Sequence, residues 1–239
     1  MKSTFIITIF LSLQLACMAQ STVLEKAWST SQSTNGLGEM ETRIDKLVTK
    51  LERHRYRNDQ HKLYALFKST HSTFLYQYSQ YSDIDELTNG KYDCLTATAL
   101  FADVLDRAGY RYNIIETNYH IFVVVKTASG DVILETTDRS SGFINDTDRI
   151  GKTIAAYRKN TLQAATPSHY QYSFSLYQTV DVDQLAGLLY FNQAVKAFNA
   201  QKWDECSEKL SAASKTIRSP RVDALAELLR QQQTYSAKK

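Results

Sequence analysis

Cys94 has the setting of a reactive thiol. It follows Asp93, a favourable helix N-cap, and opens an apolar-periodic stretch that stops at Gly109. A thiol at the first turn of a helix lies at the positive end of the peptide dipoles, which favours the thiolate. The sequence therefore predicts a helix over 94–108 with a candidate nucleophile at its start. The apolar face of this helix comprises Ala97, Leu100, Phe101, Val104, Leu105 and Ala108.

A candidate base and a candidate acid follow Cys94 in the chain. His120 lies in the apolar stretch 119–125, and Glu135 lies in the apolar stretch 132–137. Each of the three residues alone has an ordinary structural explanation, as a small core thiol, a core imidazole or an edge ion pair. Together they stand in the order that a cysteine nucleophile, its general base and an orienting carboxylate can take.

Asp138 is the alternative acid. Ser129-Gly130 predicts a hairpin turn between two antiparallel strands. With a two-residue turn at that place, Glu135 shares a sheet face with His120 but lies four residues along the neighbouring strand. Asp138 lies nearer along the strand and points to the other face. We favour Glu135, and we expect a bulge or a wider turn to decide between the two acids.

The elements that must position these residues predict an α+β fold. Apolar residues at helical spacing predict helices over 44–51 and 63–74, which would cover the nucleophile helix. From residue 110 the period changes to that of strands, at 112–116, 119–126 and 132–137. Helices followed by antiparallel strands favour an α+β fold over a doubly wound parallel sheet.

The chain becomes helical again after residue 181, with predicted helices over 185–200, 204–217 and 222–232. Small and large packing residues recur along the first two of these helices, at Ala194, Phe198, Trp203, Cys206, Leu210 and Ala213. This pattern resembles one tetratricopeptide repeat. A single repeat does not bury its own apolar face, so the segment must pack against the rest of the chain or a partner. Cys206 takes a small-residue position between the helices, which predicts a buried thiol without a disulfide to Cys94.

Residues 90–143 of the 239-residue chain carry a second resemblance. Its elements are Tyr92-Asp93-Cys94 at a helix start, a strand with His120, and Leu134-Glu135-Thr136-Thr137 followed by Gly142-Phe143. In this order and at this spacing they resemble the core of the transglutaminase-like cysteine enzymes, a superfamily related in architecture to papain. The resemblance implies a nucleophile helix packed on an antiparallel sheet.

The same resemblance implies a thiolate–imidazolium pair that acts on amides of a peptide or protein substrate. Cys94 would attack the acyl carbon, His120 would move the proton to the leaving amine, and the acid would hold the imidazole. The backbone N–H of Cys94 is the expected oxyanion donor, with Asn89 and Tyr92 as side-chain candidates. We favour hydrolysis of the acyl-enzyme over transfer to an amine, because no amine site is visible. The alternative is an inactive transglutaminase-like binding module that engages a protein partner through residues 181–239.

Residues 1–19 resemble a secretory signal peptide, with a charged start at Lys2 and an apolar run over 5–16. The run is too short for a stable membrane span, so we expect a periplasmic or secreted protein. Cys17 raises lipoprotein anchoring as an alternative. The expected organisation is a signal peptide (1–19), a flexible lead-in (20–41), a transglutaminase-like domain (42–162), a linker (163–180) and a tetratricopeptide-like helical segment (181–239).

Charge and histidine spacing exclude several other classes of function. The net charge is only +3 and no basic stripe is present, so no nucleic-acid partner is expected. The remaining histidines, His54, His61, His71 and His169, lack metal-ligand spacing with a second histidine or a cysteine. The chain has no phosphate-binding glycine loop and no nucleotide fingerprint. The sequence therefore predicts neither a metal nor a cofactor.

Overall fold

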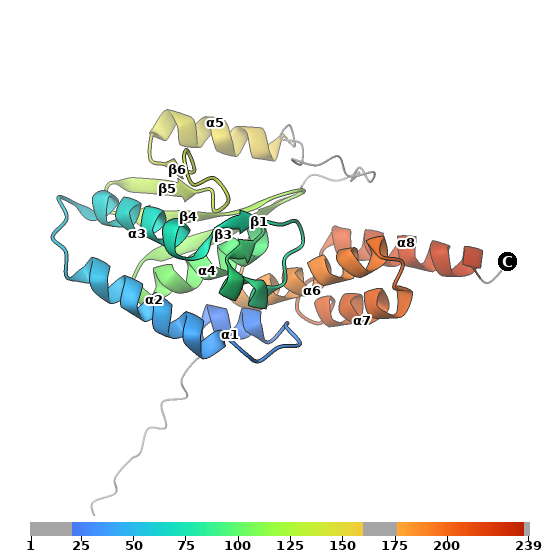
Figure 1. The fold of residues 1–239 in the computed structure, drawn as a ribbon. Coiled ribbons are helices and arrows are strands. Elements are labelled where there is room, and N and C mark those ends of the chain that lie inside the picture. Colours follow the sequence, from blue (N-terminus) through green and yellow to red (C-terminus); the bar gives the residue numbers. More distant parts are fainter. Residues whose placement is uncertain (1–20, 160–175, 237–239) are drawn as a thin grey trace, which may run out of the picture.

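The β-branched runs that follow Gly109 form an antiparallel sheet. The structure is a computed structural model that describes residues 21–159 and 176–236. Within these residues the sheet has five strands in the order β6-β5-β4-β3-β7, and helices pack on both of its faces (Figure 1). The α+β class expected from the sequence is confirmed. In chain order the elements are α1 (Val23–Trp28), α2 (Leu37–Glu52), α3 (Asp59–Phe74), β1 (Gln77–Tyr78), the 3₁₀ helix η1 (Ile84–Asn89), β2 (Lys91–Tyr92), α4 (Cys94–Arg107), β3 (Arg111–Thr117), β4 (Ile121–Thr127), β5 (Gly130–Leu134), β6 (Phe143–Ile144), α5 (Thr147–Arg158), β7 (Tyr177–Val180), α6 (Val182–Asn199), α7 (Trp203–Ala213) and α8 (Pro220–Ser236).

The strand β4 separates two apolar layers. Val123 and Val125 belong to the larger core, which contains α4, whereas Phe122 and Val124 belong to the smaller core beneath α5. This alternation follows from the two-residue period of the strand pleat. Figure 1 shows α5 on one side of the sheet and α4 on the other. The pairing register of the β4–β5 hairpin therefore decides whether a given side chain of β5 faces the larger core or the smaller core.

The turn between β4 and β5 lies one residue earlier than the sequence predicted. Thr127 pairs with Gly130, so Ala128 and Ser129 form the turn. Gly130 has a φ of +119°, which explains why a glycine opens the second strand. Relative to the expected pairing, this difference moves each residue of β5 two positions along β4.

The segment 20–41, expected to be a flexible lead-in with at most a short helix, contains the helix α1. Thr22 and Glu25 form a capping box at the start of α1. Leu24 and Trp28 are buried in the main core, where α1 contacts α4 and α6. The lead-in therefore packs on the main core through α1.

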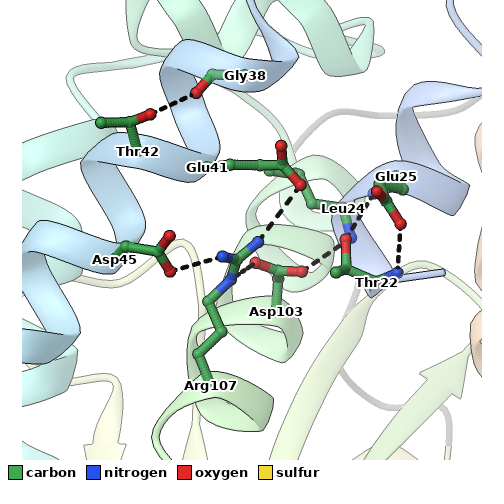
Figure 2. A network of polar contacts seen from close by, with 9 residues as sticks. All are labelled: Thr22, Leu24, Glu25, Gly38, Glu41, Thr42, Asp45, Asp103 and Arg107. Carbon is green, nitrogen blue, oxygen red and sulfur yellow. Dashed lines mark hydrogen bonds and ion pairs between the residues drawn. The ribbon is translucent and has the colours of Figure 1, made fainter. Parts of the chain in front are cut away.

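A buried carboxylate joins α1, α2 and α4. One oxygen of Asp103 accepts the N–H of Leu24, and the other pairs with the Arg107 guanidinium. Arg107 also contacts Glu41 and Asp45 of α2, as Figure 2 shows. The network ties the two N-terminal helices to the C-terminal half of α4.

We expect Asp103→Ala to lower the free energy of unfolding by about 3 kcal/mol. The substitution leaves a largely buried guanidinium and a buried N–H without their acceptor. The matched control is Asp45→Ala, which removes a 64% exposed partner of the same guanidinium. This control should cost less than about 1 kcal/mol. Urea denaturation at neutral pH measures both values, and equal losses would contradict the role assigned to Asp103.

The C-terminal helices share the main core with the rest of the chain. Leu188 and Phe191 of α6 are buried in the same apolar cluster as α1 and α4. Cys206 of α7 is fully buried, and burial raises the pKa of its thiol to about 11. Cys94 and Cys206 are both free thiols.

Part of the expected linker belongs to the sheet. Residues 177–180 form β7, which pairs with β3. The expected signal peptide at 1–19, the alternative lipidation site Cys17, and residues 163–175 of the linker lie outside the described residues. No helix within 21–159 or 176–236 is long and apolar enough to cross a membrane.

Candidate active site

Cys94 is the first residue of α4, and Asp93 is its N-cap. The Asp93 carboxylate accepts the N–H groups of Leu95 and Thr96, and the Thr96 hydroxyl accepts the N–H of Asp93 in return. This capping box explains why the helix starts where it does. The N–H of Cys94 is not among the groups that the Asp93 side chain accepts, so it remains a donor at the open end of the helix.

His120 stands directly before β4 and contacts both other members of the predicted triad. Its Nε2 lies 2.5 Å from Oε2 of Glu135, and its ring hydrogen-bonds with the Cys94 thiol. Because Nε2 faces the carboxylate, Nδ1 is the nitrogen that is available to the thiol. Burial lowers the pKa of His120, but the hydrogen bonds to Cys94 and Glu135 outweigh it and raise the pKa to about 10. Both contacts therefore favour the protonated imidazole.

The position of the hairpin turn brings Glu135 to His120. When the β4–β5 register is continued past the end of β5, Glu135 lies opposite Phe122. That position is two residues from His120 and on the same face of the sheet. The turn expected from the sequence would have left four residues between them.

The next residue, Thr136, points to the opposite side and is fully buried. Its hydroxyl lies 3.1 Å from that of Thr98 and 3.4 Å from the carbonyl oxygen of Cys94. The chain turns directly after Glu135, where the N–H of Asp138 donates to the Glu135 carbonyl oxygen, so Glu135 reaches His120 while Thr136 reaches α4. Glu135 and Thr136 thus link His120 to the N-terminal part of α4.

The alternative acid, Asp138, serves the neighbouring loop. Its Oδ1 accepts the N–H groups of Ser140 and Ser141. The hydrogen bond from the Ser141 N–H is the largest of the influences that hold the pKa of Asp138 below its ordinary value. The structure therefore places Glu135, and not Asp138, against the imidazole.

The two side chains expected to assist the oxyanion do not line the cavity at Cys94. Asn89 is exposed at the end of η1, and Tyr92 is buried with its ring edge-on to that of Tyr78. Gln80 lines the cavity instead. Its amide is a donor that the sequence did not indicate, because it lies in an irregular loop that only the tertiary structure brings to the cysteine.

Cys94 and His120 line a cavity of about 150 Å³, the triad cavity. Tyr81, which lines it, has a φ of +58°, a left-handed conformation that is uncommon for an aromatic residue and often occurs at functional sites. Larger cavities in the described residues, of about 640 and 870 Å³, are lined by neither cysteine nor histidine. From the C-terminal helices the triad cavity is lined by Leu188, Phe191, Asn192, Val195 and Arg221.

Tyr157 of α5 is a further member of the site. Its hydroxyl donates to Oε1 of Glu135 at 2.7 Å, and its ring stacks on that of His120 at 5.8 Å between centroids. The helical spacing of Ile150, Ile154 and Tyr157 is the signal in the sequence that could have placed Tyr157 on an apolar helix face. In the structure all three side chains pack against the smaller core.

We expect Tyr157→Phe to slow the alkylation of Cys94 at acidic pH by about tenfold. The variant keeps the ring stack but removes a hydrogen bond to a charged acceptor, worth about 1.5 to 3 kcal/mol. Tyr110→Phe is the matched control, because that hydroxyl donates to Asp59 away from the triad cavity. Identical rates of Cys94 alkylation in the two variants would show that the Tyr157 hydroxyl does not help to position Glu135.

A comparison of the chain with protein-family models, with curated proteins and with solved structures finds no match.

Proposed function

We propose that this protein is an exported cysteine enzyme with a transglutaminase-like core that cleaves amide bonds in peptides or proteins. The observation that carries the proposal is the chain of contacts from Cys94 through His120 to Glu135. These residues lie at the start of α4, directly before β4 and directly after β5. A thiol, an imidazole and a carboxylate in this order are the parts of an activated nucleophile. The cavity, the N-terminus of α4 and the candidate oxyanion donors all lie at Cys94.

The proposed reaction has two steps. In the first, the Cys94 thiolate attacks the acyl carbon and a C–S bond forms, while the N–H of Cys94 and the amide of Gln80 stabilise the oxyanion. His120 then gives its proton to the leaving amine, and the C–N bond breaks.

In the second step, His120 takes a proton from water, whose oxygen attacks the acyl carbon. The C–S bond breaks, the carboxylic acid leaves, and the thiolate–imidazolium pair forms again. Glu135 holds the imidazole in orientation and balances its positive charge throughout. The cycle needs no metal and no cofactor.

A catalytically inactive binding module that engages a partner through residues 181–239 is the second candidate function. It is favoured only by the repeat-like packing of α6 and α7, where Phe198 and Trp203 meet edge-on and pack against the apolar cluster that contains Cys206. The assembled triad favours the enzyme. Export rests on the signal-peptide pattern of residues 1–19, and hydrolysis is favoured over transfer to an amine.

Acylation by p-nitrophenyl acetate tests the enzyme proposal without knowledge of the natural substrate. We expect mass spectrometry to find an acetyl group on Cys94 and to see it lost with time to water. Cys94→Ala should abolish acylation and turnover, whereas Cys206→Ala should change neither. If transfer to an amine competes with hydrolysis of the acetyl-enzyme, added glycine ethyl ester would become acetylated. Wild-type protein that reacts no faster than Cys94→Ala would refute the proposal.

A further inference from the structure

We infer that the C-terminal helices position the reacting thiol and imidazole, through Asn192 on the side of Cys94 and Arg221 on the side of His120. This inference deepens the proposed function and rests on it. It makes α6 and α8 part of the catalytic unit, where the sequence predicted only that this segment packs against the rest of the chain or a partner. Asn192 and Arg221 act as positioning residues, because each one holds a residue or turn next to a member of the triad.

On the thiol side, the contact is with the N-cap of the nucleophile helix. The side-chain amide of Asn192 donates to Oδ2 of Asp93 at 3.0 Å. The other oxygen of Asp93 is the one that caps α4. Asp93 is only 2% exposed, and burial raises its pKa to about 6. A buried carboxylate keeps its place only where its oxygens are hydrogen-bonded, so α6 helps to set the start of α4.

On the imidazole side, the contact is with the turn that leads into β4. The Arg221 guanidinium donates to the carbonyl oxygens of Thr117 and Asn118, the latter at 2.8 Å. It also pairs with Glu116 at 3.3 Å; the two side chains are only 12% and 1% exposed. This turn closes on His120, whose carbonyl oxygen accepts the N–H of Thr117 and whose N–H donates to the Thr117 hydroxyl.

The two contacts lie on one packed unit. α6 and α8 are in contact, and Phe191 of α6 lies under the Arg221 guanidinium at 5.8 Å. Asn192 and Arg221 also line the triad cavity. The unit therefore bridges the residue before Cys94 and the turn before His120, which are far apart along the chain. Reaction between the two groups needs their alignment to about 1 Å, and a fixed bridge of this kind supplies it.

The test measures the pH profile of Cys94 alkylation by iodoacetamide in the full chain. Asn192→Leu removes the bond to Asp93, and Arg221→Lys keeps the charge but loses the planar fork that reaches two carbonyls. The first matched control is Gln193→Leu, on the same helix as Asn192, which removes the hydrogen bond from the Gln193 side-chain amide to the carbonyl oxygen of Thr30. The second is Arg218→Lys, which changes an exposed arginine near the start of α8.

We expect both test variants to alkylate about tenfold more slowly at acidic pH, with the steep acid-side part of the profile moved toward that of an ordinary thiol. Both controls should keep the wild-type profile, and thermal unfolding of all four should show that they are folded. A purely structural role would lower the unfolding temperature and leave the profile in place, which would overturn the inference.

The result also separates this inference from the proposed function. Wild-type protein with a His120-dependent profile but no acylation turnover would refute the enzyme and leave the positioning role intact. Full turnover in wild type, together with unchanged profiles in Asn192→Leu and Arg221→Lys, would refute the positioning role alone.

Discussion

The His120→Ala variant is expected to lose about a hundredfold or more of the wild-type rate of Cys94 alkylation at about pH 5.5. The reason is the hydrogen-bonded imidazolium, whose raised pKa of about 10 keeps a positive charge beside the sulfur over the whole neutral range. With the ring removed, only the start of α4 favours the thiolate, and the acid-side reactivity should fall to that of an ordinary thiol.

Cys206 provides the internal control in the same sample. It is fully buried, and burial raises its pKa to about 11, so it should remain unmodified in both proteins. Digestion and mass spectrometry assign the label to each cysteine. Wild-type protein whose Cys94 reacts only above about pH 8 would remove the basis of the enzyme proposal and favour the binding module.

The second large effect concerns acid stability, and it comes from His71 of α3. The ring is fully buried, and neither of its nitrogens has a hydrogen-bond partner among the described residues. Phe67 and Phe101 pack against it, with ring centroids at 4.6 and 5.3 Å. Burial, followed by the charges of Arg139 and Lys68, lowers the pKa of His71 to about 4.

The sign of the effect follows from proton binding. The unfolded chain binds a proton at His71 below about pH 6.5, whereas the folded protein resists it down to about pH 4. Folding stability is therefore lost as the pH falls through that window, by up to about 3 kcal/mol. We expect urea denaturation at about pH 4.5 to show most of this loss relative to neutral pH.

The His71→Leu variant should remove this part of the acid sensitivity. It replaces an imidazole whose nitrogens have no hydrogen-bond partner among the described residues by an apolar side chain that suits the surrounding rings. His61→Leu, at an exposed position on the same helix, is the matched control and should keep the wild-type dependence on pH. An equal loss of stability in His71→Leu and wild type would show that other groups dominate the acid transition.

Much of the fold could be predicted because its signals are local. The cap at Asp93 and the apolar period after it predicted α4, and the structure begins that helix at Cys94. The change to a two-residue period predicted strands that β3, β4 and β5 confirm. The strands β1, β2 and β6 were not predicted, since each has only two residues, too brief a stretch for its period to stand out from loop composition. The resemblance to transglutaminase-like enzymes stays a prediction.

The members of the candidate triad and their order could be predicted from local patterns: a cysteine at a helix start, a histidine at a strand and an acid on the next strand. The acid that meets His120 depends on the folded chain, because a one-residue difference in the turn moves Glu135 two positions along β4. The folded chain alone brought in Tyr157, Asn192 and Arg221. Their contacts join residues far apart in the chain, and such contacts depend on how whole elements pack and not on any local pattern.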